Sequence, residues 1–149
     1  MNAQTLAEFP FFHDISPEVL EQLAEASVEQ TLAAGEVIFR EGQSANQLHF
    51  LLSGEIALRV AIMTKPTSVT VSYVNQPYQC FGWSGLVPPH YYTATAYCET
   101  ECKILAIPAE VVRQALEAHP RDGFKIMQRI AELISYRLRN SRDALLKTL

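Results

Sequence analysis

The fold is decided by a stretch that begins with AGEVIFREG at Ala34–Gly42 and continues with LHFLLSGEI at Leu48–Ile56 and CFGWSGL at Cys80–Leu86. Gly35, Gly42 and Gly54 each stand between two runs rich in Val, Ile, Leu or Phe. Glycine accepts the positive φ angles that sharp turns between strands require. The stretch therefore predicts short strands joined by tight corners.

Working outward, the whole of residues 28–107 has this β character, with turn residues between the apolar runs. Short strands at such spacing are typical of a sandwich or barrel. Seven runs are predicted as strands: Val28–Leu32, Val37–Arg40, Leu48–Leu52, Glu55–Ile62, Val69–Val74, Thr93–Cys98 and Lys103–Ile107.

Helical patterns flank the β region on both sides. Residues 16–26 predict an amphipathic helix with Ser16 as its N-cap and Pro17 at its first position. A second helix is expected from Pro108 to Glu117, ended by His119-Pro120. A third, about 25 residues long, is expected from Asp122 to the C-terminus.

In this order of elements and glycines the chain closely resembles the cyclic nucleotide-binding domain, the effector half of bacterial regulators of the catabolite-activator type. The resemblance implies a mainly β fold with flanking helices: an eight-stranded jelly roll, or double-stranded β-helix, followed by a long C-terminal helix. It covers one domain over residues 1–149. We divide that domain into an N-terminal helical segment (1–27), the β-roll (28–107) and the C-terminal helices (108–149).

The resemblance also implies a binding site, the phosphate-binding cassette, which in the family begins Phe-Gly-Glu and ends with Arg. In the family, backbone N–H groups after the glycine and the Arg hold the cyclic phosphate, and the Glu accepts from the ribose hydroxyl. Here Trp83 stands in place of the Glu and Tyr92 in place of the Arg. The candidate pocket residues are Phe81, Gly82, Trp83, Ser84, Gly85, Tyr91, Tyr92, Thr93 and, on the long helix, Ser135.

Three interpretations of this altered cassette stay open. The aromatic side chains suit a less charged or aromatic small molecule in a mostly apolar pocket. Alternatively, cyclic nucleotide binding persists through the backbone amides alone. In the third interpretation the aromatic side chains fill the pocket, and the domain only mediates interactions. The function expected first is a regulatory, small-ligand-sensing domain that does not bind cyclic AMP in the usual way.

The long C-terminal helix carries an apolar seam flanked by charge. Such a seam packs either on the chain's own β-roll or against a second copy, and the length of the helix favours a homodimer. The seam residues are Ile126, Ile130, Leu133, Ile134, Leu138 and Leu145, and the flanking arginines are Arg129, Arg137, Arg139 and Arg142.

Composition and motifs argue against several other classes. A net charge of −4 and the lack of a following helix-turn-helix segment predict no direct DNA binding. No apolar run is long enough for a membrane helix, and the N-terminus lacks signal-peptide features, so a cytoplasmic protein is expected. The Gly82–Gly85 segment departs from the Gly-x-Ser-x-Gly motif of hydrolases, so no enzyme is predicted.

Three cysteines suggest reduced thiols in a reducing compartment. Cys98 and Cys102 are too far apart for the usual zinc pairing, so no metal site is predicted. Haem ligation by Cys80 or His90 is a minor alternative, drawn from related regulators. The partners expected are a small-molecule effector, a second copy of the chain and a regulatory protein.

Overall fold

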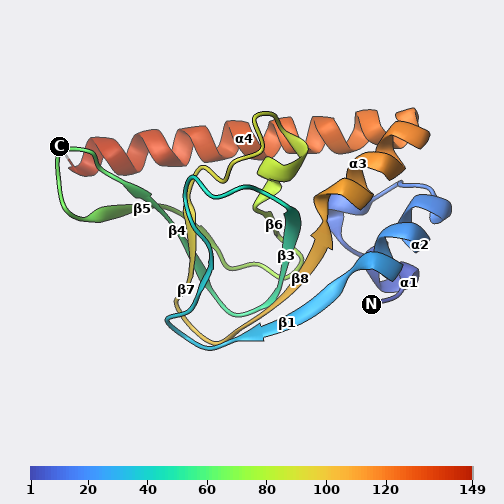
Figure 1. The fold of residues 1–149 in the computed structure, drawn as a ribbon, viewed down its shortest axis with the longest axis horizontal. Coiled ribbons are helices and arrows are strands. Elements are labelled where there is room, and N and C mark those ends of the chain that lie inside the picture. Colours follow the sequence, from blue (N-terminus) through green and yellow to red (C-terminus); the bar gives the residue numbers. More distant parts are fainter. Residues whose placement is uncertain (149) are drawn as a thin grey trace.

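The computed structural model describes residues 1–148, in which eight strands form two four-stranded antiparallel sheets (Figure 1). The strand orders are β1-β8-β3-β6 and β2-β7-β4-β5. The strands are β1 Val28–Leu32, β2 Val37–Phe39, β3 Gln47–Ser53, β4 Ile56–Ala61, β5 Ser68–Val74, β6 Cys80–Phe81, β7 Thr95–Cys98 and β8 Cys102–Pro108. The predicted jelly roll is confirmed. The eighth strand, β6, has only two residues, too few to show a periodic pattern.

Helices gather at one end of the roll and along one side of it (Figure 1). They are α1 Ala3–Leu6, the 3-10 turn η1 Pro10–Phe12, α2 Pro17–Ala26, the 3-10 turn η2 Trp83–Leu86, α3 Ala109–Ala118 and α4 Pro120–Thr148. The break predicted at His119-Pro120 is confirmed. Because proline suits the first turn of a helix, Pro120 also begins α4, two residues before the predicted start.

The sheet β1-β8-β3-β6 separates two apolar cores, one on each of its faces. Alternate residues of β3 point to opposite faces, so Leu48 and Phe50 pack against the helices while Leu51 faces the interior of the roll. β8 divides in the same way, with Leu105 on the helical side and Ile104 inside the roll. Burial on both faces explains why these two strands read as nearly continuous apolar runs.

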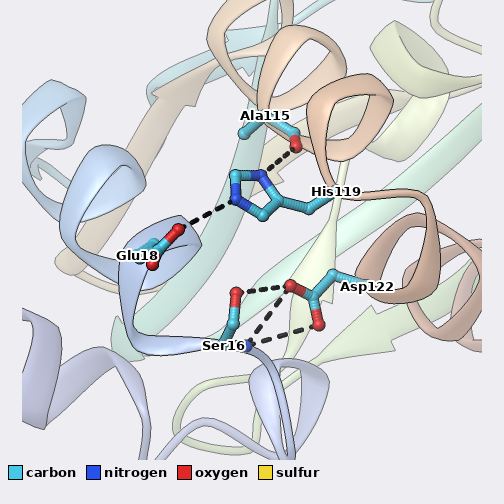
Figure 2. Close-up of polar contacts among 5 residues, drawn as sticks. All are labelled: Ser16, Glu18, Ala115, His119 and Asp122. Atoms are coloured by element: carbon cyan, nitrogen blue, oxygen red, sulfur yellow. Dashed lines mark hydrogen bonds and ion pairs between the residues drawn. The ribbon is translucent and has the colours of Figure 1, made fainter.

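The start of α4 is fixed to the N-terminal helices by a buried carboxylate. Asp122 accepts hydrogen bonds from Ser16 N at 3.3 Å and from Ser16 Oγ at 2.5 Å (Figure 2). Ser16 is the N-cap residue of α2, as predicted, but its side chain makes no capping hydrogen bond to α2, and its hydroxyl donates to Asp122. The contact joins residues 106 positions apart and fixes where α4 starts relative to α2.

A histidine supports the same junction. His119 Nδ1 lies 3.1 Å from Ala115 O, and Nε2 lies 3.2 Å from Glu18 Oε2 (Figure 2). The hydrogen bond to Glu18 raises the pKa of His119, with the bond to Ala115 acting in the same direction. Both partners are acceptors, so the pair of contacts favours the doubly protonated ring.

The glycine corners give a direct test of the roll. Gly54 has φ +103°, and a Cβ there would lie 2.5 Å from Glu101 O, a backbone atom that cannot move freely. Gly54→Ala is expected to lower the free energy of unfolding by about 3 kcal/mol, through backbone strain and the clash together. Gly42 has φ +84° but open space around it, so Gly42→Ala should cost about 1 kcal/mol. Urea denaturation of both variants measures the difference; equal costs would contradict the corner geometry.

Candidate functional site

The cassette begins where the chain leaves β6 and turns sharply into η2. Gly82 makes the turn with φ +66°, in the left-handed region. A Cβ at this position would lie 2.7 Å from His49 Nδ1 and 2.7 Å from Phe39 Cε2. Only glycine therefore fits at this position.

The end of the cassette is closed by the aromatic ring of Tyr92. This ring stacks on Phe39 with centroids 3.8 Å apart and an interplanar angle of 11°. Its hydroxyl donates to Gln47 O at 3.0 Å, and burial raises its pKa. Backbone bonds from Gly42 N to Tyr92 O and from Tyr92 N to Gln43 O fix the segment. Tyr92 thus fills space inside the roll and brings no charge.

An arginine from α4 lies over the other replaced position. The guanidinium carbon of Arg137 is 5.8 Å from the centroid of the Trp83 ring, within the range of a cation–π contact. Arg137 Nε is buried and has no hydrogen-bond partner among residues 1–148. Burial lowers the pKa of Arg137, and the charge of Glu41 acts in the opposite direction. Residues 81–96 contain no Arg or Lys, so the cation at this site, Arg137, comes from α4.

Almost no space is left between these side chains. The hollow between the cassette and α4 has a volume of about 10 Å³. A single water needs about that much, whereas small-molecule sites usually offer roughly 300–1,000 Å³. The residues that line it are Phe39, Gly82, Trp83, Ser84, Tyr92, Thr93, Ala94 and Arg137. In this conformation the pocket is closed by the protein itself.

The structure brings together five of the nine predicted pocket residues, Gly82, Trp83, Ser84, Tyr92 and Thr93. Phe81 is fully buried inside the roll, and Gly85 is buried against α3, where a Cβ would lie 2.6 Å from Ala109 Cβ. Tyr91 is exposed and pairs with Ser44 in an isolated bridge. Ser135 is an exposed residue of α4 that does not line the hollow.

Three residues that line the hollow, Phe39, Ala94 and Arg137, were not among the predicted ones. Arg137 follows Ile126, Ile130 and Leu133 at steps of four, three and four residues, which is the register of the inward face of α4. This spacing can be recognised in the sequence. However, an arginine on an amphipathic helix usually indicates an exposed flank, so Arg137 was not predicted to face the cassette. Phe39 lies on a predicted strand, and only the three-dimensional structure shows that its ring stacks on Tyr92.

A buried histidine lies behind the cassette. His49 is 3% exposed, its Nδ1 has no hydrogen-bond partner among the described residues, and its ring lies 5.2 Å from those of Phe39 and Phe81. Burial lowers its pKa from 6.5 to about 4. His49 is therefore neutral at pH 7, so it adds no cation to the site.

This lowered pKa predicts acid sensitivity of the fold. Above pH 6.5 the ring is neutral whether the chain is folded or unfolded; as the pH falls from 6.5 towards 4, only the unfolded chain takes up the proton. We expect His49 to lower the free energy of unfolding by about 2 kcal/mol between pH 7.5 and pH 5. His49→Phe should lose this part of the pH dependence. Urea titrations of both proteins at the two pH values measure this change. If the free energy of unfolding fell by the same amount in the wild type and in His49→Phe, the prediction would be contradicted.

The cysteines are buried and unpaired. Cys80, Cys98 and Cys102 are all free thiols. Burial raises the pKa of Cys80, and burial together with the neighbouring Cys102 raises the pKa of Cys98 to about 12. The thiols of Cys80 and Cys98 are therefore protonated and poor nucleophiles or ligands at neutral pH. Within residues 1–148, no group of three or more His, Cys, Asp or Glu side chains is placed to hold a metal ion.

The fold and the cassette together define a family. The family model described as cyclic nucleotide-binding domain matches residues 29–119, which include the roll, the cassette and α3. This chain therefore belongs to the cyclic nucleotide-binding domain family. Among the described helices, none combines the length and apolar character that crossing a membrane requires.

The chain is also similar to solved structures and to a curated protein. A protein of Geobacter metallireducens GS-15, described as cyclic nucleotide-binding, has a TM-score of 0.80 at 28% identity, covering 93% of this chain and 98% of that one. The sensor domain of the transcriptional regulator DNR from Pseudomonas aeruginosa has a TM-score of 0.76 at 18% identity, covering 91% and 90%; it shows the fold alone. The potassium channel SKOR of Arabidopsis thaliana is 29% identical over 138 residues, which are 87% of this chain but 16% of the channel.

Proposed function

We propose that this chain is a regulatory module that does not bind cyclic AMP in the family's usual way, because its own side chains fill the cassette. The hollow of about 10 Å³ carries this proposal. A nucleotide would have to displace the Tyr92 ring, which stacks on Phe39 and hydrogen-bonds Gln47. It would also lack the charge-assisted contact of a cassette arginine, which is among the stronger interactions a phosphate makes.

A thermal shift experiment tests the proposal. With cyclic AMP or cyclic GMP at about 1 mM, the unfolding midpoint of the wild-type chain is expected not to move. A nucleotide present at 100 times its Kd would add about 2.7 kcal/mol, or several degrees for a domain of this size. Such a shift would mean that the backbone amides of the cassette suffice for binding, and the proposal would be wrong.

A second candidate function is the sensing of another small molecule in the same pocket. The buried, unpartnered Nε of Arg137 favours it, because a buried donor on a charged group is costly unless an acceptor meets it. An acidic effector would meet it after Trp83 and Arg137 move apart. In that case Arg137→Gln would abolish the thermal shift that a small acid produces in the wild type; an unchanged shift would exclude this pocket.

We further propose that the chain acts as a homodimer through an exposed stripe on α4. The predicted seam divides in the structure: Ile126 and Ile130 are buried in the chain's own core and Leu133 is half-buried against it, so these three are not free for a partner. Ile134, Leu138 and Leu145 remain exposed. With Phe124, Met127, Ala131 and Ser141 they recur at steps of three and four, as in a coiled coil. We call these seven residues the α4 stripe.

The two proposals meet on one helix. Arg137 lies against the cassette, and the next residue, Leu138, belongs to the α4 stripe. A displacement of α4 that moves Arg137 away from Trp83 would also move the stripe, and in this way a signal would pass between the pocket and the proposed dimer. A regulatory protein partner, the absence of catalysis and of direct DNA contact, and a cytoplasmic location stay predictions.

A further inference from the structure

A second, much larger hollow lies on another side of α4. Its volume is about 740 Å³, within the usual range of small-molecule sites, and it is bounded by η1, the turn between β5 and β6, and α4. Phe11, Tyr78, Leu133 and Cys80 form its apolar walls, and Arg129 and Arg139 of α4 stand at its polar edge. We call it the α4 groove.

The walls of the α4 groove are held in place without a ligand. The Tyr78 ring stacks on Phe9 with centroids 4.2 Å apart, and Tyr78 N donates to Leu51 O at 2.6 Å. Gln79 Oε1 accepts from Asn75 N at 3.1 Å and from Gln76 N at 3.2 Å, which fixes the turn. A preformed site loses less entropy on binding than one that must first be ordered.

The charges at the groove are available to a ligand. Arg129 donates from Nη1 to Phe11 O at 2.7 Å, which uses one of its five N–H groups and orients the guanidinium. Arg139 is exposed, and among residues 1–148 it makes no ion pair. Glu132 also lines the groove, so the balance of formal charge there is positive.

We propose that the α4 groove binds a small aromatic anion, with the ring between the tyrosines and the acid group on Arg139. Tyr73 and Tyr136, both about half exposed, flank the opening and offer faces for stacking. Guanidinium groups bind carboxylates and phosphates in a bidentate manner, and aromatic rings accept planar ligands. Glu132 is the one carboxylate in the lining of the groove, against the two guanidinium groups of Arg129 and Arg139, so the charge balance favours an anion over a cation.

The α4 groove and the α4 stripe do not compete for the same surface. Each residue turns an α-helix by about 100°, so Arg129 and Tyr136 lie on nearly the opposite side of α4 from the stripe. Arg139 lies about 100° around the helix from Leu138, which also places it outside the stripe. A dimer formed through the stripe would leave the groove open. A ligand there would contact both the roll and α4, and so could bias the position of the helix.

Titration of the full chain with 2-naphthoate, followed by ¹H–¹⁵N NMR, tests the groove. Saturable shifts are expected for the amides of residues 73–80 and 129–139, with little change in residues 82–94. Arg139→Gln should weaken the binding at least about tenfold, whereas Arg121→Gln, an exposed arginine of α4 outside the groove, should leave it unchanged. The uncharged 2-naphthamide should bind more weakly than the acid.

Three results would overturn the inference: shifts centred on the cassette, an unchanged affinity in Arg139→Gln, or no saturable shift up to about 10 mM, well beyond the range of weak specific binding. Shifts at the cassette that vanish in Arg137→Gln would instead support the second candidate function. Because cyclic nucleotide binding is measured separately, failure of the groove and failure of the proposed function can be told apart.

Discussion

Leu138→Glu is expected to convert the proposed dimer into monomers. Leu138 is 69% exposed in the single chain and belongs to the α4 stripe. In a parallel pair of α4 helices joined through the stripe, its two copies would face each other. Burying two carboxylates in an apolar seam is strongly unfavourable. We expect the dimer Kd to rise on the order of a thousandfold, which corresponds to about 4 kcal/mol.

Sedimentation velocity over a range of concentrations measures this effect. Gln128→Glu is the matched control, because Gln128 is an exposed residue of the same helix outside the stripe and gains the same charge. It should leave the dimer intact. A wild-type chain that stays monomeric at high concentration, or a Leu138→Glu variant that still dimerises like the control, would contradict the proposed stripe.

Tyr92→Ala is expected to cost about 4 kcal/mol in the free energy of unfolding, or roughly 10 °C in the unfolding midpoint. The variant loses the stacking on Phe39 and the hydrogen bond to Gln47, and it leaves a cavity within the roll. Tyr92→Phe keeps the ring and loses only the hydroxyl, so it should cost about 1 kcal/mol.

Tyr91→Ala provides the neighbouring control. Tyr91 is 52% exposed, so removing its ring should change stability by less than about 0.5 kcal/mol. Urea denaturation of the three variants gives the comparison. If Tyr92→Ala cost no more than Tyr91→Ala, Tyr92 would not be a structural part of the closed pocket.

The positions of most strands along the chain were predictable from the sequence, because glycines and alternating apolar runs are local signals. Gly35, Gly42 and Gly54 mark corners, and each has the positive φ that its corner needs. β6 was not predicted because its two residues are too few to show an alternating apolar pattern. Strand ends differ by one or two residues where a neighbouring strand, such as β8 beside β3, extends the pairing to Gln47 and Pro108.

The site was predictable in composition but not in arrangement. The replacement of the expected charges by Trp83 and Tyr92 could be seen directly, whereas the inward stacking of Tyr92 on Phe39 depends on contacts between distant strands. Likewise, the spacing of α4 residues predicts an apolar face but does not say which face the roll covers. Packing of Ile126 and Ile130 into the core decided that question. The α4 groove joins three separate segments and has no local signal.

The fluorescence of Trp83 during a cyclic AMP titration tests the closed cassette most directly. Trp83 is the only tryptophan in the chain and lies beside Arg137 in the pocket, so any occupant of the cassette must change its surroundings. We predict no saturable change in its emission up to about 1 mM nucleotide, the range of very weak binding. A saturable change with a micromolar Kd would show that the pocket opens to cyclic AMP, and would contradict the proposal that side chains of this domain have taken the nucleotide's place.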